Sequence, residues 1–237
     1  MKTIRIAHLY YDLMNLYGET GNILALKMAL KRQNVRFEVD ELTKGSKIDF
    51  SKYEIFIMGC GTEENQEIVR KDIIRYKEEF KKYVKIKTFI ITGNALELFG
   101  TSINNKEALQ VFNFKAKGIR KRIVGEQVYK TYLFQEPVIG FQNRGSIHDN
   151  KENHLFEIIS GNADNQSSKF EGIKVNHFYG TYLLGPLLIR NPKLTNTILK
   201  ELFEAKKYPF KEILDTPEEM AYEAYLKNFL QNKNVQN

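Results

Sequence analysis

The sequence predicts an α/β fold: a single three-layer domain with a mostly parallel central sheet and helices on both faces. In the first 100 residues, strand-like and helix-like patterns follow one another in the order strand, helix, strand, strand, helix, strand, helix. Two of the strand-like runs, Tyr53–Met58 and Thr88–Ile91, are almost entirely apolar, as in parallel strands that are buried on both faces. Residues 1–237 contain no repeat, long linker or low-complexity tract, so one domain is expected.

Local patterns predict each element. Val35–Leu42 alternates apolar and charged residues, which suits a strand near the sheet edge. Thr62 is a plausible helix cap, and Thr216-Pro217-Glu218-Glu219 combines an N-cap, a first-turn proline and a capping-box acid. The expected strands are Thr3–Tyr10, Val35–Leu42, Tyr53–Met58, Thr88–Ile91, Glu126–Phe134, Pro137–Gln142, Leu155–Ile159 and Gly172–Tyr179, and the expected helices are Gly21–Gln33, Thr62–Tyr83, Ala95–Phe99, Pro192–Lys207 and a final helix at about residues 216–232.

Composition excludes several classes of protein. The net charge is +7, but the lysines are scattered over helices and interleaved with acids, so a nucleic-acid partner is not expected. One cysteine rules out a disulfide framework, and no segment approaches the ~18–20 apolar residues of a membrane helix. We therefore expect a cytoplasmic protein with no membrane insertion. The histidines show no metal-ligand spacing, and neither a metal nor a cofactor is expected.

The most informative stretch is KTFIITGNALELFG at residues 87–100. An apolar strand breaks sharply at Thr92-Gly93-Asn94 before helical spacing resumes. Strand, tight turn and helix form the nucleophile elbow with which α/β enzymes present a Ser or Cys above the sheet. Here the turn carries Gly93, so the scaffold for nucleophilic catalysis is present without its nucleophile.

Further motifs accompany the elbow, and together they resemble one family. They are Asn15-Leu16-Tyr17-Gly18 with Gly21-Asn22, Leu98-Phe99-Gly100, Arg122-Ile123-Val124-Gly125, Gly140-Phe141-Gln142-Asn143-Arg144-Gly145 and Gly180-Thr181-Tyr182-Leu183-Leu184-Gly185-Pro186. In order and spacing, over nearly the whole chain, they resemble the class I glutamine amidotransferases of the cobyric-acid-synthase branch. The resemblance implies a flavodoxin-like fold. It also implies a heterodimer with a Mur-ligase-like (MurT-type) partner that amidates the D-glutamate of lipid II.

The catalytic residues of the family do not carry over. Alignment on Leu98-Phe99-Gly100 places Gly93 at the family's cysteine and Glu97 at a glutamine, while Leu184 stands where the family has histidine. That cysteine attacks the glutamine amide, and that histidine shuttles the proton that releases ammonia. Since neither position keeps its residue, the resemblance implies a degenerate, non-catalytic subunit.

Structural explanations also exist for these replacements. Gly93 relieves strain at a turn, Asn94 and Glu97 are spaced as an N-cap with its returning acid, and Leu184 suits a packed position. Thr92, Cys60 and His177 are the candidate substitutes for the lost catalytic groups.

The substrate pocket is the remaining expectation. Arg122 matches an arginine that the family uses near glutamine, although it could equally pair with a glutamate. Gly59 and Gly61 resemble the oxyanion-stabilising loop of the family, and Asn94 and Glu97 complete the expected substrate-binding set. Three functions stay open: a non-catalytic partner subunit, a glutaminase with an unusual nucleophile, and a regulator that binds glutamine or another small molecule.

Overall fold

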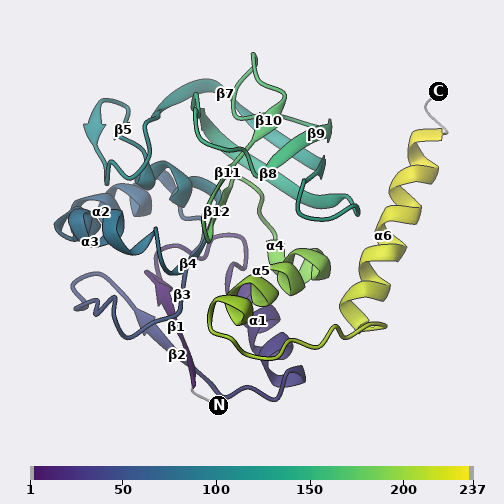
Figure 1. The fold of residues 1–237 in the computed structure, drawn as a ribbon. Helices are drawn as coiled ribbons and strands as arrows, with labels where there is room; N and C mark the ends of the chain where they lie inside the picture. Colours follow the sequence, from purple (N-terminus) through teal and green to yellow (C-terminus); the bar gives the residue numbers. More distant parts are fainter. Residues whose placement is uncertain (1–2, 235–237) are drawn as a thin grey trace.

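In the computed structural model, which describes residues 3–234, six strands form a central sheet in the order β11-β12-β4-β3-β1-β2 (Figure 1). All neighbouring strands are parallel except the β11–β12 pair, so the mostly parallel sheet expected from the sequence is present. The strands are β1 (Ile4–Leu9), β2 (Phe37–Leu42), β3 (Ile55–Met58), β4 (Thr88–Thr92), β11 (Ile173–Val175) and β12 (Phe178–Thr181).

Helices cover both faces of this sheet and make a three-layer arrangement. On one face, Ile6 and Ile57 of the sheet share a buried cluster with Leu26 and Ile198. On the other face, Phe56 and Phe89 stack with ring centroids 4.7 Å apart and share a cluster with Phe80. The first face is covered by α1 (Thr20–Arg32), α4 (Leu187–Arg190) and α5 (Pro192–Ala205), and the second by α2 (Glu63–Ile73), η1 (Ile74–Tyr76), α3 (Lys77–Tyr83) and the 3-10 helix η2 (Gly93–Phe99).

A second sheet, mostly antiparallel, lies beside the central one and was not expected from the sequence (Figure 1). Leu184, just beyond β12, forms a bridge with Phe141, and its N–H donates to the Phe141 carbonyl over 2.8 Å. This contact holds the segment after β12 against the second sheet. The strands are β5 (Ser102–Ile103), β6 (Lys106–Glu107), β7 (Lys115–Lys130), β8 (Val138–Ile147), β9 (Phe156–Ser160) and β10 (Phe170–Glu171).

Several expected elements differ in detail. The expected strand Gly172–Tyr179 is a hairpin, because Asn176 takes a positive φ of 48° and turns β11 back into β12. The expected helix Thr62–Tyr83 is interrupted by η1, and the expected helix after the elbow is a 3-10 helix. β7 starts at Lys115, well before the expected Glu126, since its first half is polar and lacks an apolar run.

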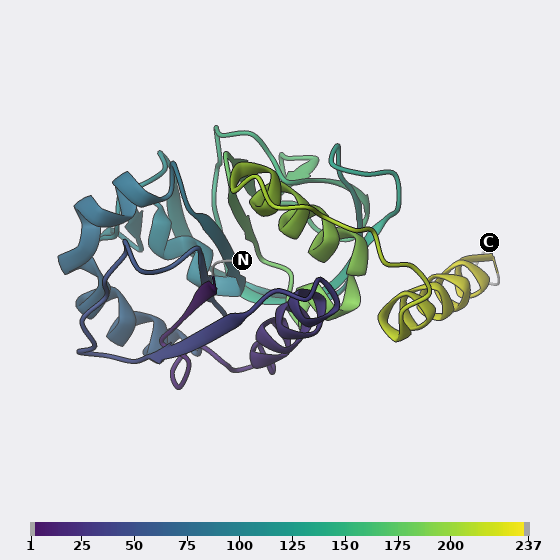
Figure 2. The same cartoon turned by 60° about the horizontal axis from the view of Figure 1, so that its bottom comes forward.

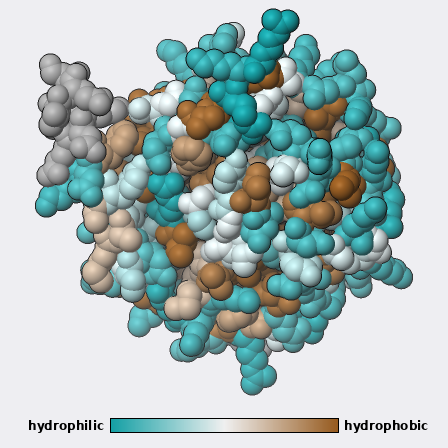
Figure 3. Space-filling view, turned by 180° about the vertical axis from the view of Figure 1, so that it is seen from behind, coloured by the Kyte–Doolittle hydropathy of each residue, from teal (hydrophilic) through white to brown (hydrophobic). Residues whose placement is uncertain are grey.

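The C-terminal helix α6 (Pro217–Asn234) projects from the body of the molecule (Figure 2). Its capping box is confirmed: Glu219 N–H donates to the Thr216 hydroxyl and Thr216 N–H donates to the Glu219 carboxylate. On the face seen in Figure 3, apolar side chains occur in separate groups among hydrophilic ones. Within residues 3–234, no helix has both the length and the apolar character needed to cross a membrane.

Candidate functional site

The elbow is formed where β4 ends. Thr92 pairs with Thr181 of β12, so Gly93 lies at the carboxyl end of the parallel strands. Gly93 has a φ of 61°, in the left-handed region that side chains avoid, and η2 begins there. This strand-turn-helix geometry is the one expected for a nucleophile elbow.

Gly93 and Leu184 meet at this turn. An ideal Cβ on Gly93 would lie 2.7 Å from Leu184 Cδ2 and 2.5 Å from Cys60 Cβ, both closer than real Cβ contacts. The two positions aligned with the family's cysteine and histidine are thus adjacent in space. Leu184 is 1% exposed, which fits the packing interpretation of this residue.

Cys60 lies against the elbow but is poorly suited to attack a substrate. Burial raises the pKa of its thiol to about 12, so the thiol is neutral at physiological pH. The thiol donates to the Gly61 carbonyl over 3.5 Å. No histidine among the described residues hydrogen-bonds it.

Thr92 is engaged elsewhere. Its hydroxyl, 1% exposed, donates to the carboxylate of Glu19 over 2.5 Å. Glu19 is itself fully buried beside the elbow, and burial raises its pKa to about 7. Asn22 donates to the same carboxylate oxygen over 2.9 Å. No sequence pattern pointed to Glu19, although this residue lies between the two N-terminal motif segments.

His177 is wrong as a substitute base. It directly precedes β12, whose first residue, Phe178, pairs with Phe89 near the start of β4. Four residues at about 3.3 Å each separate it from Thr181 at the elbow end of the sheet. Its ring instead faces Glu201 over 3.4 Å.

The glycine loop expected to stabilise an oxyanion is closed by Asn94. The Asn94 side chain accepts from Gly61 N–H over 3.0 Å and donates to the Gly61 carbonyl over 2.9 Å. Gly59 is required for packing, because a Cβ there would lie 2.3 Å from Glu19 Cβ. The Gly61 amide is therefore already used.

Glu97 is not a capping acid, which corrects the interpretation of the Asn94–Glu97 spacing. Its carboxylate is 3% exposed, accepts from the Ser146 hydroxyl, and accepts from Gln66 Nε2 over 2.9 Å. Burial raises its pKa above the usual range. Glu97 therefore joins η2, α2 and β8 through buried hydrogen bonds.

Arg144, in the motif of residues 140–145, is a structural residue. Its buried guanidinium donates to the carbonyls of Ser146, Ala163 and Asp164, and it stacks 4.1 Å from the centre of the Tyr182 ring. Each guanidinium nitrogen donates to at least one protein acceptor, so the group is held firmly in the second sheet.

Arg122 pairs with a glutamate, the second of its two expected alternatives. Its guanidinium donates to Glu63, and to the side chain and carbonyl of Asn143 over 2.8 and 3.1 Å. The ion pair is solvent-accessible, since 45% of the Arg122 side chain is exposed.

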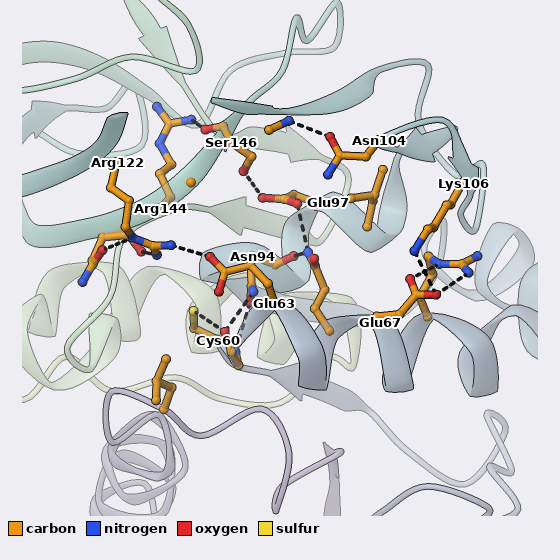
Figure 4. Close-up of a pocket in the computed structure, with 18 of the residues that line it drawn as sticks. Cys60, Glu63, Glu67, Asn94, Glu97, Asn104, Lys106, Arg122, Arg144 and Ser146 are labelled. Carbon is orange, nitrogen blue, oxygen red and sulfur yellow. Dashed lines mark hydrogen bonds and ion pairs between the residues drawn. The ribbon is translucent and has the colours of Figure 1, made fainter. Parts of the chain in front are cut away.

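Some of these residues line a cavity of about 150 Å³ between η2 and the second sheet, whereas Gly93 and Leu184 do not (Figure 4). In Figure 4, Arg122 and Glu63 reach toward each other on one side, while Glu67 and Lys106 lie on the other. Thr92, Gly59 and His177 do not line it. Within the described residues, no group of His, Cys, Asp and Glu could hold a metal ion. The cavity is lined by Leu16, Tyr17, Cys60, Gly61, Glu63, Gln66, Glu67, Arg70, Asn94, Glu97, Ile103, Asn104, Lys106, Gly118, Arg122, Asn143, Arg144, Gly145 and Ser146.

Curated proteins of similar sequence share one name. The chain is 29% identical over 216 residues to the lipid II isoglutaminyl synthase (glutamine-hydrolyzing) subunit GatD of Staphylococcus aureus, covering 89% of this chain and 88% of that one. It is 28% identical over 215 residues to the GatD subunit of Streptococcus pneumoniae, covering 86% and 82%. No protein-family model matches the sequence.

Solved structures of similar fold are described as a glutamine amidotransferase and a glutaminase domain. One, described as a glutamine amidotransferase, aligns with a TM-score of 0.52 at 15% identity, covering 83% of this chain and 98% of that one. The glutaminase domain of Trypanosoma brucei CTPS aligns with a TM-score of 0.52 at 10% identity, covering 91% and 98%. The chain thus has the fold of the class I glutamine amidotransferases, and its sequence resembles the GatD subunits.

Proposed function

We propose that this chain is a degenerate GatD-like subunit, a non-catalytic scaffold or regulatory partner of a Mur-ligase-like (MurT-type) amide synthetase in cell-wall precursor amidation. The contact between Gly93 and Leu184 carries the proposal. Glutamine hydrolysis needs a nucleophile and a proton carrier within hydrogen-bond reach of each other. At this elbow, Gly93 has only a hydrogen atom as its side chain and Leu184 has an isobutyl group.

The environment of the elbow supports the same conclusion. The Asn94 side chain accepts from the Gly61 amide. A substrate oxyanion would have to displace this interaction before that amide could stabilise it. A partner subunit that uses free ammonia needs none of these groups.

The test measures two activities of the full chain, alone and co-purified with the Mur-ligase-like protein of the same genome. We expect no glutamate release from glutamine in either sample. We expect the complex to amidate lipid II with an ammonium salt and not with glutamine. A GatD that keeps its Cys and His serves as the positive control for the glutamate assay. Glutamine-dependent amidation would contradict the proposal.

The alternative is a glutaminase that uses Cys60, and one observation favours it. The sulfur of Cys60 lies 2.8 Å from the ideal Cβ position of residue 93 and lines the cavity. A thiol from the glycine loop thus reaches the place where the family's nucleophile begins. Glutamate release that disappears in Cys60→Ala would establish this alternative.

A further inference from the structure

One segment concentrates much of the positive charge of the chain. Residues 108–125 contain no Asp or Glu but five basic residues, which gives them a formal charge of +5 in a chain of net charge +7. The five are Lys115, Lys117, Arg120, Lys121 and Arg122, all on β7. The basic residues are therefore concentrated on β7, although the lysines of the helices are interleaved with acidic residues.

Four of these five side chains have no anionic partner. Arg122 pairs with Glu63, whereas Lys115, Lys117, Arg120 and Lys121 are exposed and form no ion pair within residues 3–234. We name these four residues the basic strip. Unpaired like charges on neighbouring residues repel one another, and an acidic partner relieves this repulsion.

Two residues of the basic strip, Arg120 and Lys121, lie beside the cavity because β7 bulges there. Gly118 pairs with Ser146 and Ile123 pairs with Arg144, so four β7 residues, 119–122, lie opposite the single residue Gly145. Gly118 and Arg122 both line the cavity. Arg120 and Lys121, which lie between them, are thus carried outward at its mouth.

We propose that the basic strip docks an acidic segment of the amide-ligase subunit and so sets that subunit over the cavity. The inference rests on the heterodimer of the proposed function. Two exposed apolar side chains accompany these features: Val124, which follows the strip on β7, is 56% exposed, and Leu16, which lines the cavity, is 49% exposed. Charges around exposed apolar groups are typical of protein interfaces. Residues 115–124 contain no aromatic side chain for stacking on bases, which disfavours nucleic acid.

The experiment uses the full chain with Arg120→Glu and Lys121→Glu together. The affinity and association rate for the Mur-ligase-like subunit are measured at 50, 150 and 400 mM NaCl. We expect at least 10-fold weaker binding at 50 mM, mostly through slower association, and a shallower dependence on salt. Lys44→Glu with Lys47→Glu is the matched control, because both lysines are exposed and the charge change is identical. We expect binding within 2-fold of the unmodified chain.

Equal loss of binding in the two double variants, or no loss in either, would show that the basic strip is not the docking site. The heterodimer itself would still stand. If the unmodified chain forms no complex with the ligase subunit, the proposed function itself is overturned. Phosphatidylglycerol vesicles and duplex DNA are the further probes. Selective loss of binding to either by the Arg120/Lys121 variant, with ligase binding intact, would assign the strip to that partner instead. Circular dichroism and urea unfolding establish that both variants are folded.

Discussion

The sulfur of Cys60 lies 2.8 Å from the position that a Cβ on Gly93 would occupy. These residues belong to different loops, one after β3 and one after β4, which the parallel pairing of the two strands brings to the same sheet edge. Cys60 and Leu184 together fill the space in front of the elbow, so the loss of a side chain at position 93 leaves no hole there.

This packing predicts a steric conflict if a side chain is restored. Gly93→Ala should destabilise the fold by about 2–4 kcal/mol, because a positive φ and a close contact with Cys60 add together. Cys60→Gly should recover part of that loss in the double variant. Urea unfolding of the four proteins in the cycle measures the coupling, which we expect to be about 1–3 kcal/mol.

Gly45→Ala is the control for this cycle. Gly45 has a φ of 83° but nothing within 4 Å of its ideal Cβ, so its replacement should cost only about 1–2 kcal/mol of backbone strain. Equal costs at Gly45 and Gly93, with no coupling to Cys60, would contradict the packing account.

The thiol of Cys60 should be almost unreactive in the folded protein. Burial raises its pKa to about 12, so its thiolate fraction at pH 7.5 is roughly 10³ times smaller than that of a free cysteine. Labelling by a disulfide reagent should therefore be at least that much slower in buffer than in 6 M urea. Fast labelling of the native protein would revive Cys60 as a nucleophile.

Glu19 should make stability decrease between about pH 4.5 and pH 7. Its pKa is raised to about 7 in the folded state, so over this range the folded protein binds more protons than the unfolded chain and loses stability as pH rises. The decrease should reach about 2–3 kcal/mol. Glu19→Gln should make this decrease smaller, and a further part of it is expected from Glu171, whose pKa burial also raises to about 7.

Glu67→Gln is the comparison for that profile. The Glu67 carboxylate hydrogen-bonds Arg70, which lowers its pKa to about 2, so its contribution is lost only as pH falls below about 4.5. This variant should change the unfolding free energy below about pH 4.5 and leave its slope between pH 4.5 and pH 7 unchanged. A changed slope between pH 4.5 and pH 7, with no change below pH 4.5, would show that the assignment of this slope to Glu19 is wrong.

Two arginines beside the cavity should differ in their effect on stability. Arg144→Ala should cost about 3–5 kcal/mol, because it leaves the buried carbonyl of Ala163 without its donor and that of Asp164 with only the N–H of His148. Arg122→Ala should cost at most about 1 kcal/mol, since its ion pair with Glu63 is accessible to solvent. Comparable costs for the two in urea unfolding would refute the distinction between them.

The sequence by itself determined the parallel sheet and the elbow turn. Apolar runs such as Tyr53–Met58 have to be buried, and a Gly between strand and helix marks a tight turn whatever surrounds it. The capping box at Thr216 was equally readable, because it depends only on residues within four positions of one another.

Only the tertiary structure decided what surrounds the elbow. Asn94 and Glu97 have the spacing of a cap, but Gly61 and Ser146, distant in sequence, offer them stronger partners. His177 looked close to the motif along the chain, yet the direction of β12 carries it to the far end of the sheet. Cys60 and Gly93 meet because two parallel strands end together, and pairing between strands is a long-range interaction that local patterns do not specify.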